Sequence, residues 1–151
     1  MTTTTHHPFL DFRAAVELII ATADQQQAMT RLAEQVPGRR MDAHDPWFHR
    51  TGLDVLGQLV SGAAALCPHL GPGRGFGPMY AQLGGKPLRI DCRLCLAVRP
   101  KLSPVDDNTC DRCSVYARGG LVGGAIPIGP LMLLFGVCGT CAGALGLREA
   151  A

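Results

Sequence analysis

The sequence has little excess charge of either sign. Its 151 residues include 14 Lys and Arg against 12 Asp and Glu, which leaves a formal net charge of +2. Acidic and basic residues are interspersed, whereas a protein that binds nucleic acid through electrostatics concentrates basic residues on one surface. The composition therefore gives no general argument for nucleic-acid binding.

The chain also lacks the pattern of a secretory signal peptide. Its first twenty residues carry no basic stretch before an apolar core, and Asp11, Arg13 and Glu17 interrupt the apolar positions. We therefore expect a cytoplasmic location, where the reducing conditions would keep seven cysteines from forming a disulfide framework. Residues 119–147 carry no charge, but nine glycines and two prolines interrupt them. We expect no membrane-spanning helix there.

The N-terminal part has helical character. Residues 1–8 are a polar Thr/His stretch and are expected to form a disordered tail. Residues 9–70 carry apolar residues at helical spacing and predict a helical region. Its two helices, over 9–36 and 53–66, are expected to pack as a hairpin, joined through a loop at 41–52.

The C-terminal part has shorter elements separated by Gly, Pro and Asp. Residues 71–78, GPGRGFGP, are expected to be a linker, and residues 79–151 to be a zinc-binding module. Residues 79–83 are compatible with one helical turn. Extended pieces are predicted at 87–91, 114–118 and 131–137. The predicted fold class is α+β, with a helical hairpin followed by short β-hairpins and a short C-terminal helix.

Six of the seven cysteines form three Cys-x-x-Cys pairs. Two thiolates at this spacing on a tight turn can both reach one Zn²⁺ at about 2.3 Å, and a tetrahedral structural site needs two such arms. The remaining cysteine lies in a CPH motif and supplies a fourth arm together with the histidine. The sequence therefore predicts two zinc ions held by eight ligands: Cys67, His69, Cys92, Cys95, Cys110, Cys113, Cys138 and Cys141.

Three groupings of these arms satisfy the spacing. In the sequential grouping the CPH arm and Cys92/Cys95 hold one zinc, while Cys110/Cys113 and Cys138/Cys141 hold the other in a treble-clef arrangement. An interleaved, RING-like grouping is the second. The third is a zinc ribbon that joins Cys92/Cys95 to Cys110/Cys113. The positive end of a helix beginning at the last pair would favour thiolates there.

The sequence CGTC at 138–141 resembles the redox motif of thioredoxin-like proteins. A thioredoxin domain needs further sheet and helix after its motif, and only ten residues follow Cys141. A hydrolytic zinc site keeps an open coordination position, which arms saturated with cysteine do not leave. We therefore expect no enzyme, and a zinc–thiol redox sensor is the alternative use of the same residues.

A local cluster of basic residues bears on possible partners. Arg89, Arg93, Arg99 and Lys101 lie close together in the sequence and could contact nucleic acid. The simpler interpretation is a solvated surface around a zinc site, so a protein is the preferred partner.

The order of the motifs resembles a known group of proteins. CPHL, GPMYAQLGG, RIDCRLC, CDRC and GPLMLLFGVCGTC, spread over residues 66–142, resemble small actinobacterial proteins of unassigned function that carry a CPH and three CxxC pairs. The resemblance implies zinc binding by these residues and no activity. Combined with the cysteine count, it predicts an interaction or regulatory adaptor with two structural zinc ions.

Overall fold

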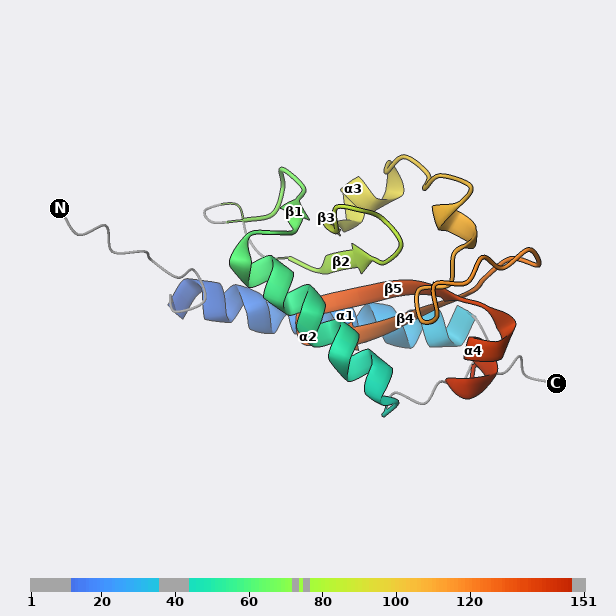
Figure 1. Ribbon diagram of the computed structural model, residues 1–151. Helices are drawn as coiled ribbons and strands as arrows, with labels where there is room; N and C mark the ends of the chain where they lie inside the picture. The colour runs from blue at the N-terminus through green and yellow to red at the C-terminus, as the bar shows by residue number, and fades with distance from the viewer. Residues whose placement is uncertain (1–11, 36–43, 72–73, 75–76, 148–151) are drawn as a thin grey trace.

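The protein is an α+β domain built on one mixed sheet. The computed structural model describes residues 12–35, 44–71, 74 and 77–147 (Figure 1), so the predicted tail at 1–8 lies outside the described residues. The helices are α1 (Phe12–Gln35), α2 (Pro46–Ser61), α3 (Arg93–Ala97) and α4 (Gly139–Ala144), with a short 3₁₀ helix at Asp106–Asn108. The strands are β1 (Ala65–Leu66), β2 (Met79–Gln82), β3 (Arg89–Cys92), β4 (Val122–Ile128) and β5 (Leu131–Val137).

The five strands lie in the order β1-β3-β2-β5-β4. Two pairs of strands, β2–β3 and β4–β5, are antiparallel, and β2 runs parallel to β5 where the two pairs join. At the far edge β1 pairs in parallel with β3. The sheet therefore crosses the boundary that the sequence analysis places at residues 71–78, because strands from both sides of that segment belong to it.

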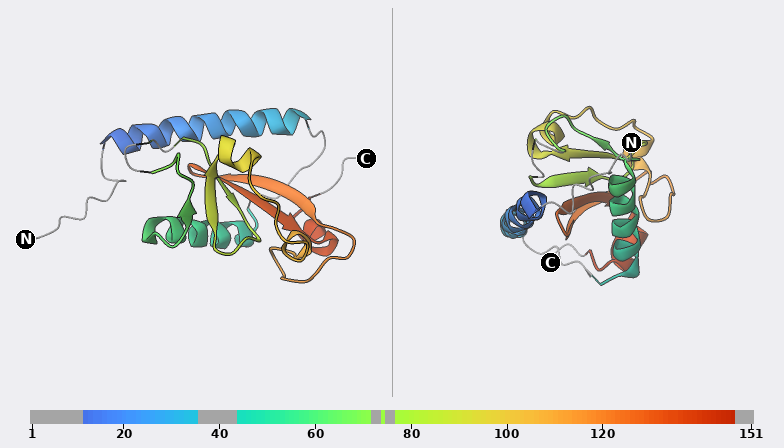
Figure 2. Two further views of the ribbon diagram at one scale, coloured as in Figure 1. Left: turned by 90° about the horizontal axis from the view of Figure 1, so that it is seen from above. Right: turned by 90° about the vertical axis from the view of Figure 1, so that its left-hand side faces the viewer.

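The two long helices cover opposite faces of the sheet (Figure 2). The expectation of a helical hairpin is therefore wrong. In β5, Met132 is fully buried and the adjacent Leu133 is 1% exposed. Since successive side chains of a strand point to opposite faces, both faces of this strand need cover. On the α1 side the fully buried Gln25 donates a hydrogen bond from Nε2 to the carbonyl of Met79 at 3.2 Å.

Helix α2 begins earlier than the apolar periodicity predicts. The Asp45 carboxylate accepts a hydrogen bond from the backbone N–H of Trp47 at 2.8 Å, and Pro46 occupies the first helical position. An aspartate followed by proline is a strong helix start, so the expected loop over 41–52 is wrong from residue 46 onward. The helix also ends earlier than expected, at Gly62, whose φ of 75° forms a left-handed cap.

The segments 79–83 and 114–118 also differ from the sequence expectation, and the predicted extended piece at 114–118 forms no strand but only an isolated bridge from Tyr116 to Thr109. Residues 79–82 form strand β2 rather than a helical turn, because they pair with β3 on one side and β5 on the other. The uncharged residues 119–147 form the β4–β5 hairpin and α4. In the part of the chain that the structure describes, no helix is both long enough and apolar enough to cross a membrane.

An aromatic cluster joins α2 to β5. The rings of Trp47 and Phe48 lie 5.5 Å and 5.2 Å from that of Phe135, measured between centroids. All three side chains are buried. Phe135 in turn faces Gly124, its cross-strand partner in β4. This contact explains the glycine, because an aromatic ring folded over a strand leaves no room for a side chain opposite it.

Replacing Gly124 tests this packing. A Cβ atom at position 124 would lie 2.3 Å from Cζ and 2.7 Å from Cε2 of Phe135. We expect Gly124→Ala to lower the free energy of unfolding by about 1–3 kcal/mol, since the ring must leave the aromatic cluster. The control is Gly57→Ala in α2, where a Cβ meets nothing within 4 Å. That change should raise stability by about 0.5–1 kcal/mol. Equal urea midpoints for the two variants would contradict the packing.

Candidate metal centres

Eight side chains gather into two groups of potential metal ligands. Site 1 contains Cys67, His69, Cys92 and Cys95, and site 2 contains Cys110, Cys113, Cys138 and Cys141. In each group the ligand atoms all lie within 4.8 Å of one another. These are the groups of the sequential pairing, not those of the interleaved or ribbon pairings.

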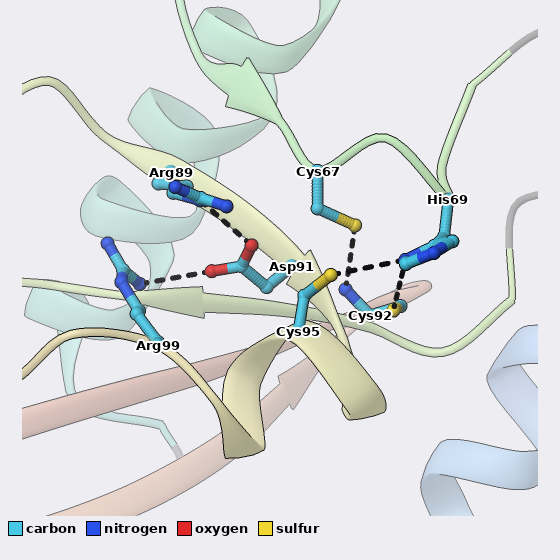
Figure 3. Close-up of polar contacts among 7 residues, drawn as sticks. All are labelled: Cys67, His69, Arg89, Asp91, Cys92, Cys95 and Arg99. Carbon is cyan, nitrogen blue, oxygen red and sulfur yellow. Dashed lines mark hydrogen bonds and ion pairs between the residues drawn. The ribbon is translucent and has the colours of Figure 1, made fainter.

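Strand pairing builds site 1 (Figure 3). Cys67 follows β1, and its backbone N–H donates to the carbonyl of Ile90 in β3 at 2.9 Å. Cys92 ends β3, and its N–H donates to Cys67 Sγ at 3.3 Å. His69 Nδ1 lies 3.1 Å from Cys95 Sγ and 3.7 Å from Cys92 Sγ. The β1–β3 pair therefore brings the CPH arm beside the CRLC arm.

Site 2 joins a tight turn to the end of β5. Cys110 and Cys113 occupy the turn, in which the N–H of Ser114 donates to the carbonyl of Cys110 at 2.8 Å. Cys138 follows β5 directly and caps α4, which contains Cys141. The sulfur atoms of Cys113 and Cys138 are 3.8 Å apart.

Asp111 fixes the turn of site 2 against β5. Its backbone N–H donates to the carbonyl of Gly136 at 2.9 Å, and its Oδ2 accepts from the N–H of Gly136 at 2.7 Å. Burial raises the pKa of Asp111 to about 6, although the Gly136 N–H opposes that rise. The sequence analysis missed this residue. The one available signal was its position inside the CDRC pair, directly after the first ligand, Cys110.

The two sites share a local plan. In each, a strand runs into a cysteine at the N-cap of a short helix, and the second cysteine of the pair lies inside that helix. The N-cap backbone angles are alike, with φ −75° and ψ 169° at Cys92 and φ −64° and ψ 161° at Cys138. Helices of five and six residues are unstable in isolation. A metal ion bound by the cysteines at the start of each helix would therefore stabilise both α3 and α4.

The donor sets and distances fit tetrahedral metal ions. With metal–sulfur bonds of about 2.3 Å, a regular tetrahedron has sulfur–sulfur edges of about 3.8 Å. The Cys113–Cys138 distance of 3.8 Å equals that edge. A disulfide would need about 2.05 Å, and all seven cysteines are free. Three sulfurs with one imidazole nitrogen, and four sulfurs, are both standard sets for a structural metal site.

The pKa values of the thiols show how readily the cysteines of each site lose their protons. Burial opposes ionisation of Cys92 and Cys110, but backbone N–H groups lower both pKa values to about 7: those of Cys95 and Leu94 act on Cys92, and those of Cys138 and Cys113 act on Cys110. Burial and then the neighbouring sulfurs raise the pKa of Cys95 to about 11 and that of Cys141 to about 12. In each group one thiol therefore ionises readily, whereas ionisation of a further thiol is opposed. A bound divalent cation would stabilise the additional thiolates and lower their pKa values.

The buried Asp91 lies beside site 1 and holds two of the basic residues considered for nucleic-acid binding. Its Oδ1 accepts a hydrogen bond from Arg89 Nε at 2.9 Å, and its Oδ2 is 3.5 Å from Arg99 Nη1. The hydrogen bond and the charge of Asp91 raise the pKa of Arg89. The other two residues, Arg93 and Lys101, are exposed. The four basic side chains therefore do not form one free cationic surface.

No family model, curated protein or solved structure matches the chain. The resemblance to small actinobacterial proteins therefore stays a prediction. The case for metal binding rests on the donor atoms, their distances and their positions on the strands and helices.

Proposed function

We propose that the chain is a non-catalytic interaction protein whose fold is stabilised by two structural zinc ions. The observation that carries this proposal is that two separate groups each bring four thiol or imidazole donors within 4.8 Å. Soft sulfur ligands in a tetrahedral set favour zinc. Four protein ligands also fill the coordination shell, so neither ion would keep a position for a substrate.

Site 2 supports a treble-clef assignment within this proposal. It combines a turn with two cysteines, the β4–β5 hairpin and a short helix that begins at the second pair. Site 1 has the same strand-to-helix arm but takes its other arm from the CPH segment. We assign the protein to the zinc-stabilised adaptors rather than to enzymes, with a protein as its partner.

One observation favours a second candidate, a zinc–thiol redox sensor. Cys113 is exposed, while its site partner Cys110 is only 1% exposed. An exposed thiolate ligand is the first to meet an oxidant, and its oxidation releases the metal. Loss of zinc from site 2 on mild treatment with hydrogen peroxide, while site 1 keeps its ion, would favour this candidate.

Metal analysis tests the proposal. Elemental analysis of the purified protein should give two zinc ions per chain. X-ray absorption should give zinc–sulfur distances of about 2.3 Å, with seven sulfur and one nitrogen ligands shared between the two ions, as the donor groups require. A folded protein with no metal, with iron, or with paired cysteines would contradict the proposal.

A further inference from the structure

Helix α3 presents an apolar surface to solvent next to site 1. Val98 is 80% exposed and Leu94 is 73% exposed, the two highest values among the large apolar side chains that the structure describes. The two are four residues apart, the spacing that places side chains on one face of a helix. Ala97 between them is exposed as well. Exposed apolar side chains that lie together are candidates for a binding surface.

The segment that carries this surface holds charge of a single sign. Residues 92–105 contain three basic residues and no acidic residue. Arg99 is turned toward Asp91, and its side chain is only 10% exposed. Arg93 and Lys101 remain exposed on either side of Leu94 and Val98 in the sequence. The α3 surface, defined as Arg93, Leu94, Val98 and Lys101, therefore combines exposed apolar and exposed cationic side chains.

A metal ion in site 1 would hold the α3 surface in a fixed conformation. Leu94 lies between two of the site's ligands, because Cys92 is the N-cap of α3 and Cys95 lies inside the helix. Val98 ends the helix three residues later. A metal ion bound by both cysteines would fix the backbone that carries these side chains. A surface ordered in advance loses little conformational entropy when a partner binds.

We propose that the α3 surface binds an acidic protein segment with large apolar side chains. This inference rests on the proposed function and names the chemistry of its partner. Leu94 and Val98 would be covered by the apolar side chains of the segment, and Arg93 and Lys101 would pair with its carboxylates. Nucleic acid fits the surface less well, because a phosphate backbone supplies charge but leaves the two apolar side chains exposed.

A random short-peptide library displayed on phage and selected on the zinc-loaded full chain provides the test. Selection should enrich peptides that combine Asp or Glu with Leu, Ile or Phe. Binding of one enriched peptide, followed by fluorescence anisotropy, should weaken about tenfold or more in Leu94→Ser/Val98→Ser. Arg93→Glu/Lys101→Glu should weaken binding to a similar extent and remove its salt dependence.

Matched variants elsewhere on the surface serve as controls. Leu53 is 70% exposed and Val115 is 58% exposed, so Leu53→Ser/Val115→Ser removes comparable apolar side chains outside α3. Arg50 and Arg118 are exposed, and Arg50→Glu/Arg118→Glu makes the same change in charge. Both controls should bind the peptide as the parent does.

The outcomes separate this inference from the proposed function. A chain that holds two zinc ions but enriches no acidic peptide overturns the inference and leaves the zinc proposal standing. The inference also fails if the control variants lose binding equally. It fails too if a short DNA duplex binds through Arg93 and Lys101 without help from Leu94 and Val98. A chain without zinc defeats the proposed function itself.

Discussion

We expect from the proposed function that a high-affinity chelator, by removing two zinc ions, unfolds the protein at neutral pH. Zinc binding stabilises zinc-finger peptides by roughly 10–16 kcal/mol per site. The whole free energy of unfolding of a domain is only about 5–15 kcal/mol. Loss of two such sites therefore exceeds the stability that the rest of the fold can supply.

The positions of the ligands explain why unfolding would be global rather than local. Cys67 and Cys110 are each 1% exposed and belong to the hydrophobic core. Val137, which directly precedes Cys138, and Leu145, which follows α4, are fully buried. Without the metal, the raised pKa values of Cys95 and Cys141 keep these thiols protonated at neutral pH, so no thiolate–metal bonds tie the strand ends together. The strand ends that carry the cysteines and the core residues beside them would then unfold together.

The single tryptophan makes this prediction easy to measure. Trp47 is 8% exposed and its ring contacts Phe135 in β5, the strand that leads into site 2. Chelation should shift its fluorescence to longer wavelength, and added zinc should restore the original emission. Chelator saturated with zinc beforehand is the control and should change nothing. A metal-free protein with unchanged emission and cooperative urea unfolding would refute a folding role for the ions.

The sequence was a good guide to which side chains lie together. Two cysteines three residues apart are constrained by their own turn, so the pairs are visible without knowledge of the fold. Which pairs meet is a tertiary property, and three groupings satisfied the spacing. The short β1–β3 pair decides it, since it places Cys67 beside Cys92. A two-residue strand has no periodicity from which it could have been predicted.

The arrangement of the helices was harder to predict, for a different reason. Helical spacing identified α1 and α2 but not the surfaces they cover. In α1 the expected apolar positions Val16 and Ile20 are 38% and 56% exposed, while Ala21 and Gln25 are fully buried. The apolar run LMLLF at 131–135 could have indicated that both faces of the sheet are covered, because a strand buried on both faces has a continuous apolar sequence. Such a strand requires a helix on each side.

The geometry of His69 allows a sharp test of the one histidine among the eight proposed ligands. Its Nδ1 atom, the ring nitrogen nearer the backbone, is the one that lies 3.1 Å from Cys95 Sγ. A cysteine sulfur at the same position would reach nearly as far along the same direction. Both a three-sulfur, one-nitrogen set and a four-sulfur set suit structural zinc. A cysteine at position 69 is therefore the conservative replacement, and alanine removes the donor.

We expect His69→Ala to lose the zinc ion of site 1 and His69→Cys to keep it. With three thiolates left, site 1 should bind zinc at least about 10–100-fold more weakly, the loss that even an outer-shell change produces. Elemental analysis after dialysis against a moderate chelator should give one zinc ion per chain for His69→Ala and two for His69→Cys and the parent. X-ray absorption of His69→Cys should show only sulfur ligands.

His49→Ala, which removes an exposed histidine of α2 outside both groups, is the control and should keep two ions. Two ions retained with full affinity in His69→Ala would exclude His69 as a ligand, and site 1 would then be a three-cysteine centre with an open position.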